Sequence, residues 1–229
     1  MIRAVLLDAL GTLLELEDPG PPLAAELADA GVPITEDEAR AAVLAEMTYY
    51  KDHHDEAHDR ASLVDLRLRC AQVLSDHLPP DARQLGIPRL TEVLLAALRF
   101  RPYDEVPATL EALRALGMKL VVISNWDVSL HDQLAATGLA PLVDGAVSSA
   151  EAGAGKPHPD IYTRALDLAG VAPAEALMVG DSPDTDVAGA LALGIPAVLV
   201  DRWGAAEAPA GAAKVASLAE VPALVESRE

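Results

Sequence analysis

Short apolar runs and segments of helical spacing alternate over most of the chain. Apolar runs that suit buried strands cover residues 2–8, 119–124, 145–148, 176–180 and 197–200. Segments with helical spacing lie between or beside these runs, at residues 108–116, 130–137, 160–168 and 186–193. Continuous apolar runs are typical of strands buried on both faces, and parallel strands require crossovers of this length. The pattern therefore predicts a parallel α/β sheet.

The stretch between the first strand and the rest has a different pattern. Residues 23–98 show helical spacing, with breaks near Pro79 and Pro80, and contain no convincing strand. We predict an α/β fold: a Rossmann-like parallel sheet core formed by residues 1–15 and 99–229, with an all-helical cap inserted as residues 16–98. We interpret an alanine-rich stretch, residues 205–213, as a surface loop.

Polar side chains stand where the predicted strands end, at the sheet edge where open α/β folds build their sites. These residues are Asp8, Ser124, Asn125 and Asp181. Asp186 stands at the start of the next predicted helix, and Lys156 lies on the loop between Gly155 and Pro157. Carboxylates that converge on one point repel each other unless a cation joins them. The pattern therefore predicts a divalent metal site, and Mg²⁺ prefers carboxylate, carbonyl and water oxygens.

Composition narrows the possible partners. The chain of 229 residues has a net charge of −19 and a pI near 4.5. This charge excludes nonspecific binding to nucleic-acid phosphates, which needs a basic face, and argues against docking on an anionic membrane. The negative charge of the protein also repels an anionic substrate such as a phosphate. A metal ion and Lys156 must therefore offset this repulsion at the site. A single cysteine, Cys70, and a first strand that begins at once favour a cytoplasmic protein. We further expect a small-molecule substrate and a monomer or homodimer.

Four motifs in this order resemble the haloacid dehalogenase-like (HAD) hydrolase superfamily. The segment Asp8-Ala9-Leu10-Gly11-Thr12-Leu13 is similar to its nucleophile loop, and Ser124 stands where its second motif has Ser or Thr. Lys156 matches the basic residue of the third motif, and Gly180-Asp181-Ser182 with Asp186 resembles the fourth. The helical insert after the first motif is similar to the C1 type of cap.

The resemblance implies a phosphatase-type hydrolase that forms an aspartyl-phosphate on Asp8, while Lys156 neutralises charge in the transition state. The implied Mg²⁺ ligands are Asp8, Asp181, Asp186 and the main-chain carbonyl of Leu10. The implied substrate-binding residues at this sheet edge are Thr12, Ser124 and Asn125.

Position 10 departs from the phosphatases of that superfamily. They usually carry a second aspartate two residues after the nucleophile, which protonates the leaving oxygen and later activates water, whereas this chain has Leu10. General acid–base catalysis is typically worth about 10²–10⁴ in rate. We therefore expect slow turnover, or a preference for activated leaving groups such as acyl or aryl phosphates.

Two cap histidines are further candidates for substrate binding. His54 and His58 are four residues apart and are predicted to share one helix face. A histidine that faces the substrate would suit the role of the missing acid, because its unperturbed pKa is about 6.5.

Three other functions remain open. A metal-independent 2-haloacid dehalogenase would also lack the second aspartate, but Asp181 beside Asp8 would repel a carboxylate substrate in the absence of Mg²⁺. A catalytically impaired binding protein with this fold would explain Leu10, whereas the retained Asp8, Asp181 and Lys156 favour an enzyme. A phosphonate-cleaving variant would use Lys51 to form a Schiff base with an aldehyde, but a single exposed helix lysine is ordinarily solvated.

Overall fold

The computed structural model describes residues 1–227 and divides into two compact units. The core unit consists of Met1–Glu15 and Pro102–Glu229, and the helical unit is Leu16–Arg101. The predicted cap, residues 16–98, ends a few residues earlier than the helical unit does. The two segments that join the units, β2 (Leu14–Leu16) and β3 (Phe100–Pro102), pair as a two-stranded sheet. This pairing was not predicted, since three residues are too few to show a period.

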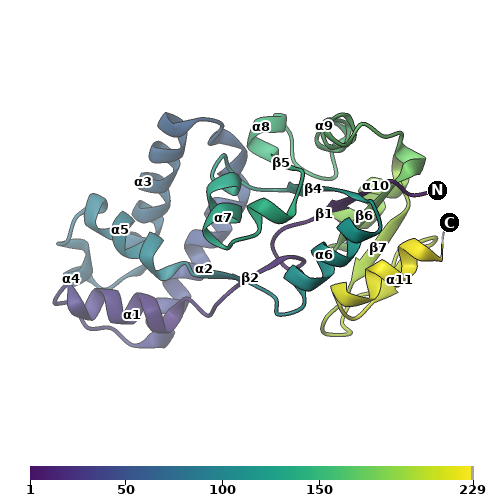
Figure 1. The fold of residues 1–229 in the computed structure, drawn as a ribbon. Coiled ribbons are helices and arrows are strands. Elements are labelled where there is room, and N and C mark those ends of the chain that lie inside the picture. The colour runs from purple at the N-terminus through teal and green to yellow at the C-terminus, as the bar shows by residue number, and fades with distance from the viewer. Residues whose placement is uncertain (228–229) are drawn as a thin grey trace. The chain divides into compact units, whose positions relative to one another are not determined.

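The core unit is built on a six-stranded sheet with the order β5-β4-β1-β6-β7-β8, in which neighbouring strands are parallel (Figure 1). Its strands are β1 (Ala4–Leu7), β4 (Lys119–Ser124), β5 (Gly145–Ser148), β6 (Ala176–Gly180), β7 (Ala197–Val200) and β8 (Ala213–Val215). The predicted parallel α/β sheet is confirmed. The first strand along the chain lies in the interior of the sheet, between β4 and β6, and chain order runs outward from it in both directions. Such a switch point is where doubly wound sheets form a crevice.

Helices cover both faces of this sheet, which explains why its strands are apolar throughout. Leu6, Ile123 and Met178 pack into one cluster with residues of α9 (Pro159–Ala169), while α6 (Val106–Ala115) and α11 (Val221–Glu226) lie on the other side (Figure 1). The other helical segments of the core unit are α7 (Leu130–Ala136), η2 (Ala140–Leu142), α8 (Ser149–Ala152), η3 (Pro173–Glu175), η4 (Pro183–Ala188), α10 (Gly189–Ala192) and η5 (Leu218–Glu220).

Three details of the core unit differ from the sequence-based expectation. The helix predicted at residues 186–193 is a π-helical turn, η4, followed by the short α10. The alanine-rich stretch is a loop as predicted, except that its last residue begins β8. Neither β8 nor α11 was predicted, because short segments near the end of the chain show little periodicity.

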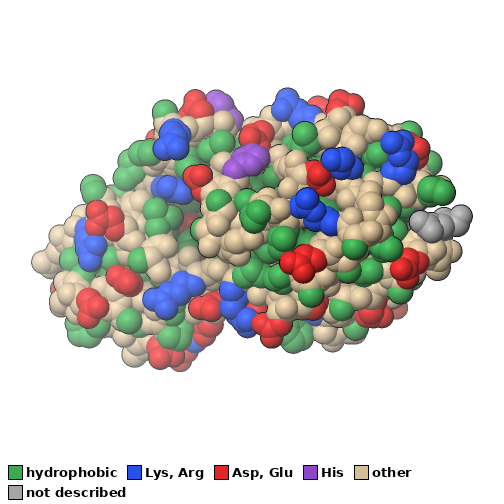
Figure 2. Space-filling view, in the orientation of Figure 1, with side chains coloured by type: hydrophobic (Ala, Val, Ile, Leu, Met, Phe, Trp, Pro, Cys, Tyr) green, Lys and Arg blue, Asp and Glu red, His purple; other side chains and the backbone are tan. Residues whose placement is uncertain are grey.

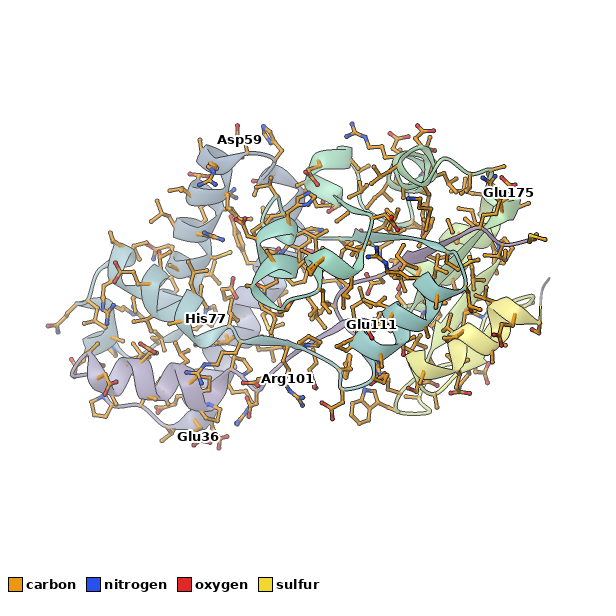
Figure 3. All side chains as sticks on the ribbon, viewed as in Figure 1. Glu36, Asp59, His77, Arg101, Glu111 and Glu175 are labelled. Carbon is orange, nitrogen blue, oxygen red and sulfur yellow. The ribbon has the colours of Figure 1, made fainter. Side chains whose placement is uncertain are left out.

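The helical unit contains α1 (Gly20–Asp29), α2 (Glu36–His53), η1 (His54–Glu56), α3 (Arg60–His77), α4 (Pro80–Arg83) and α5 (Ile87–Ala97). Capping boxes at Thr35 and Asp59 start its two longest helices, α2 and α3. Figure 3 labels Glu36, the first residue of α2, and Asp59, which precedes α3. Helix α2 packs against α1 and α3, and α3 packs against α5. Between residues 17 and 98 the described chain has no strand, as predicted.

Charged side chains of both signs are interspersed on the face of the molecule shown in Figure 2. Acidic residues outnumber basic ones in the chain, 36 to 17. Among the described helices, none has both the length and the apolar character that crossing a bilayer requires.

Candidate active site

Five of the predicted site residues meet at the carboxyl edge of the sheet. Asp8 follows β1 and Asp181 follows β6, while Ser124 is the last residue of β4. In the parallel register Leu7 lies opposite both Val122 and Val179, so these strands end at nearly the same level. The loop before α9 supplies Lys156, and η4 supplies Asp186. Register, rather than local sequence, therefore brings together residues that are more than 170 positions apart in the chain.

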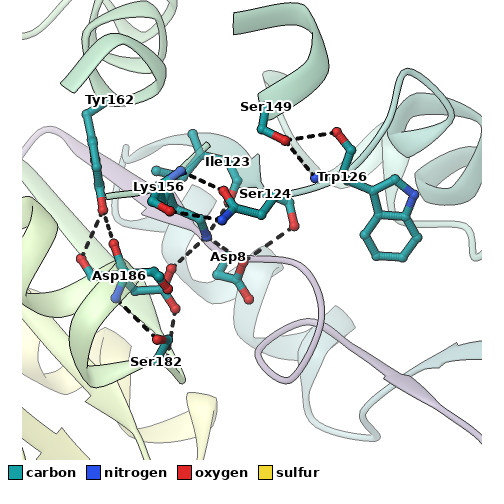
Figure 4. Close-up of polar contacts among 11 residues, drawn as sticks. Asp8, Ile123, Ser124, Trp126, Ser149, Lys156, Tyr162, Ser182 and Asp186 are labelled. Atoms are coloured by element: carbon teal, nitrogen blue, oxygen red, sulfur yellow. Dashed lines mark hydrogen bonds and ion pairs between the residues drawn. The ribbon is translucent and has the colours of Figure 1, made fainter. Parts of the chain in front are cut away.

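Lys156 is the centre of the charge network (Figure 4). Its Nζ lies 2.6 Å from Oδ1 of Asp8 and 2.6 Å from Oδ1 of Asp186, and it donates to the carbonyl of Ile123 at 2.9 Å. The side chain is buried. Burial alone would lower the pKa of Lys156, but the carboxylates of Asp186 and Asp8 outweigh it and raise this pKa. The lysine therefore stays charged and holds the two carboxylates in place.

Asp8, Asp181 and Asp186 each offer an oxygen to one point, and these oxygens all lie within 4.8 Å of one another. Burial raises the pKa of Asp8 to about 7, although Lys156 acts in the opposite direction. Partial loss of hydration and the neighbouring Asp186 also raise the pKa of Asp181, although this residue is exposed. One lysine cannot balance three carboxylates, so the site needs either a proton or a further cation.

One buried oxygen shows that the site suits a metal ion. Oδ2 of Asp8 is inaccessible to solvent and has no hydrogen-bond partner within the described residues. A buried carboxylate oxygen without a partner is costly. A hard divalent cation bound by Asp8, Asp181 and Asp186 would satisfy it, since such ions prefer carboxylate oxygens.

Two glycines allow the acidic side chains to come this close. Gly11 has a φ of 92°, and a Cβ there would overlap the carboxylate of Asp181. A Cβ on Gly180 would likewise overlap the side chain of Asp186. Position 11 must therefore be glycine for two reasons: its backbone is left-handed, and the carboxylate of Asp181 occupies the space that a Cβ would need.

The predicted phosphate-binding residues lie around the same point. The Ser124 hydroxyl donates to Oδ1 of Asp8 at 3.4 Å, and the buried Thr12 hydroxyl has no partner among the described residues. Asn125 is engaged differently, because its Oδ1 accepts from the Lys156 amide at 2.6 Å and its Nδ2 donates to the Lys156 carbonyl at 2.9 Å. Its amide thus orients the lysine loop. Direct substrate binding by these residues stays a prediction.

Leu10 lies in the same loop with its side chain 39% exposed. The side chain does not belong to the packed core, so position 10 is open to other residues. Its predicted role as a metal ligand through the main-chain carbonyl stays a prediction.

The structure adds one supporting residue that the sequence did not indicate, Tyr162, and gives a supporting contact to Ser182 of the fourth motif. The Tyr162 hydroxyl donates to the carbonyl of Thr185 and, at 3.4 Å, to that of Asp186. The Ser182 amide donates to Oδ2 of Asp186 at 3.0 Å. Both hold η4 so that Asp186 faces Lys156 (Figure 4). No sequence signal separates Tyr162 from the other apolar positions of α9.

The two histidines of the helical unit do not share a helix face, and that prediction is wrong. Helix α2 ends at His53, so His54 starts the 3₁₀ turn η1, and His58 lies in the loop before α3. His54 is buried, with Nδ1 at 2.9 Å from the carbonyl of Lys51, whereas His58 is exposed. The capping box at Asp59 starts a new helix, α3, after His58. The two histidines therefore do not lie in one continuous helix, and their spacing of four residues does not place them on one face. A substrate-binding role for either histidine stays a prediction.

The sequence matches a known family along most of its length. Residues 2–194 match the family model described as haloacid dehalogenase-like hydrolase. The chain therefore belongs to this family of hydrolases.

Three proteins of known type are similar to this chain in sequence or in fold. Phosphoserine phosphatase of Thermus thermophilus is 42% identical over 105 residues, which cover 45% of this chain and 42% of that protein. The chain thus spans less than half the length of this curated relative. A 2-haloacid dehalogenase from Pseudomonas syringae has a TM-score of 0.71 and 26% identity, with 100% of both chains covered. A HAD phosphatase from Thermococcus onnurineus has a TM-score of 0.67 and 28% identity, with 98% of both chains covered.

Both a dehalogenase and a phosphatase are thus similar in fold to this protein. The fold alone does not distinguish the two reactions, so the choice between them depends on the side chains at the sheet edge.

Proposed function

We propose that this hydrolase is a Mg²⁺-dependent phosphatase that acts on a small phosphorylated metabolite. The observation that supports this most is the convergence of Asp8, Asp181 and Asp186, with ligand oxygens within 4.8 Å of one another beside the buried Lys156. The single cysteine, Cys70, is buried and suits a reducing compartment, so we propose a cytoplasmic enzyme.

Asp8, Asp181 and Asp186 would hold the metal, with the main-chain carbonyl of Leu10 as a further ligand. When bound, Mg²⁺ supplies the positive charge that offsets the three carboxylates and the phosphate oxygens. This charge is needed because the chain as a whole is strongly acidic and repels anionic substrates.

The protein side chains divide the chemistry between them. The Asp8 carboxylate attacks phosphorus, and the bond between phosphorus and the leaving oxygen breaks, with its electron pair departing on that oxygen. Water then attacks the aspartyl-phosphate, releasing inorganic phosphate and regenerating Asp8. Lys156, which already contacts Asp8, neutralises charge that develops on the phosphoryl group.

Leu10 determines which substrates turn over well. It cannot give a proton to the leaving oxygen, so that oxygen must depart as a stable anion or take its proton from water. We therefore propose a preference for acyl or aryl phosphates over simple alkyl phosphates.

A 2-haloacid dehalogenase is the second candidate, favoured by Leu10 and by the fold of the Pseudomonas enzyme. In that reaction Asp8 would attack carbon and displace halide. The cluster of Asp181 and Asp186 beside Asp8 opposes it, because without a cation the site would repel a haloacid carboxylate.

One assay panel separates the two candidates. Purified protein is tested against acetyl phosphate, p-nitrophenyl phosphate, O-phosphoserine and 2-chloropropionate, with Mg²⁺ and with EDTA, and with Asp8→Asn as control. The proposal predicts phosphate release that requires both Mg²⁺ and Asp8, fastest on acetyl phosphate. Chloride release that persists in EDTA, with no phosphate release, would overturn it.

A pair of substitutions tests the role of position 10. Leu10→Asp should raise turnover of O-phosphoserine by up to about 10²–10⁴, because it restores a proton donor and acceptor. The partial exposure of Leu10 means that the fold should tolerate the change. In Leu10→Asn the side chain has the same shape as the aspartate of Leu10→Asp but cannot exchange a proton, so this variant should give no such gain. Equal rates for wild type and a folded Leu10→Asp variant would contradict the account.

A further inference from the structure

Arg202, two residues after the end of β7, contacts the loop that follows Asp8. Its Nε donates to the carbonyl of Gly11 at 3.3 Å, and its Nη2 donates to the carbonyl of Thr12 at 2.8 Å. These residues are about 190 positions away in the chain. The planar guanidinium thus forms a fork on two successive carbonyls, which an ammonium group does not match.

The guanidinium is itself fixed by its neighbours. Nη1 pairs with Oε1 of Glu105 at 2.6 Å, and the guanidinium carbon lies 3.6 Å from the centroid of the Tyr103 ring. The Ser217 hydroxyl donates to the same oxygen of Glu105 at 3.3 Å. The Arg202 side chain is only 11% exposed. A charged group that is stacked, paired and mostly buried is well ordered, so it is suited to define the position of a loop.

The loop is confined on its other side as well. Gly11 lies so close to Asp181 that a Cβ would overlap the carboxylate. The same peptide segment therefore has the Arg202 donors on its carbonyl oxygens and an acid of the candidate metal site against its α-carbon. A shift of this segment would change the separation between the main chain after Asp8 and Asp181.

We propose that Arg202 is a positioning residue: by holding the carbonyls of Gly11 and Thr12 it sets the distance between the Asp8 loop and Asp181. The catalytic consequence rests on the proposed phosphatase function, whereas the structural consequence does not. Within the described residues, the hydrogen bonds and ion pair of Arg202 go to Gly11, Thr12 and Glu105 and not to Asp8, Lys156 or Asp186, so Arg202 takes no direct part in the chemistry.

The test uses Arg202→Met, which keeps an apolar stem over Tyr103 and removes the fork. Arg114→Met is the matched control, because Arg114 also donates to a main-chain carbonyl, that of Pro141 at 2.9 Å, at a position outside the site. The first readout is amide hydrogen exchange of residues 9–14, whose amides at Leu13 and Leu14 bond to the carbonyl of Ala9. Exchange there should speed up by about tenfold or more in Arg202→Met and stay unchanged in Arg114→Met.

The second readout is kinetic. Since misplacement of a reacting group by about 1 Å can cost about 10²-fold, kcat should fall by that order while KM changes much less. Arg202→Lys should lie between Met and wild type in both readouts. Wild-type exchange and kcat in a folded Arg202→Met variant would overturn the proposal. Should that variant not fold, wild-type values in Arg202→Lys would overturn it equally.

The two proposals fail in different ways. An inactive wild-type protein in the phosphate assays would remove the phosphatase function and leave the exchange experiment to decide on Arg202. An active wild type with unchanged loop exchange in the Arg202 variants would remove only the positioning role.

Discussion

Buried ionisable side chains are arranged differently in the two units. In the core unit, Asp8, Lys156 and Asp186 form a paired cluster at one edge of the sheet. In the helical unit, Glu46 on α2 and His54 in η1 are buried separately, and they bond to neighbours of their own unit: Glu46 to Cys70 and His54 to the carbonyl of Lys51.

The difference follows from the geometry of sheets and helices. Parallel strands lie about 4.8 Å apart and end at one edge, so the residues that follow them meet. Packed helices have no such common edge, so their polar residues are spread along the helices and meet only in separate pairs, such as Glu46 with Cys70. A charged residue at a strand end is thus stronger evidence for a site than a charged residue on a helix.

Removal of the central lysine should have the largest effect on stability. Lys156→Met would leave Asp8 and Asp186 buried without their cation, which typically costs about 3–5 kcal/mol. The matched control is Lys119→Met, since Lys119 pairs with Asp144 at 3.0 Å but is 59% exposed. Such a pair is worth about 0–1 kcal/mol. Urea unfolding at pH 8 measures both, and equal losses for the two variants would contradict the paired-cluster description.

The pH dependence of stability tests the raised pKa of Asp8. In the metal-free folded protein this pKa is about 7, against 3.8 ordinarily. Between these values the folded state keeps a proton that the unfolded chain releases, so stability should fall as pH rises from 4 to 7. The slope is at most about 1.4 kcal/mol per pH unit for one group.

Unfolding of wild type and Asp8→Asn in EDTA at several pH values isolates this contribution. The difference between them should change across the window from pH 4 to 7 and level off above it. Mg²⁺ must displace the same proton, so its affinity should rise with pH up to about 7. Parallel pH profiles for the two proteins would show that Asp8 does not titrate in this way.

Substitution of Asn125, at the same site, should reduce stability by a smaller amount. Asn125→Asp keeps the oxygen that accepts from the Lys156 amide but turns the donor to the Lys156 carbonyl into an acceptor. Loss of a buried hydrogen bond with an unsatisfied group costs about 1–3 kcal/mol. We expect that loss of stability, measured by urea unfolding, together with a lower kcat and little change in KM. A direct phosphate contact would instead raise KM.

Substitution of Glu46, the buried carboxyl of the helical unit, should have the smallest effect on stability and none on Mg²⁺ binding. Burial raises the pKa of Glu46, so its ionisation above the ordinary value of 4.5 costs stability. Glu46→Gln should therefore become more stable relative to wild type as the pH rises above 4.5. Its Mg²⁺ affinity, measured by titration calorimetry, should stay at the wild-type value. Loss of Mg²⁺ binding in this variant would contradict the claim that the metal site depends on the carboxylates of the core unit and not on those of the helical unit.

Strand positions were predicted well from the sequence, because a buried parallel strand is apolar throughout and ends in polar residues. The strands at 119–124, 145–148, 176–180 and 197–200 were placed at the bounds that the structure gives. Asp8 and Asp181 follow from the same rule. The supporting contacts of Tyr162 and Arg202 could not be predicted, because they depend on which loops meet in three dimensions. The histidine prediction failed because a capping box at Asp59 starts a new helix within the assumed one.

The most direct test is a crystal structure of the protein grown with Mn²⁺, which replaces Mg²⁺ and is located by its anomalous scattering. The account predicts one strong anomalous peak bonded to carboxylate oxygens of both Asp8 and Asp181. A peak elsewhere, or bonded to only one of these two residues while the other faces away, would contradict it.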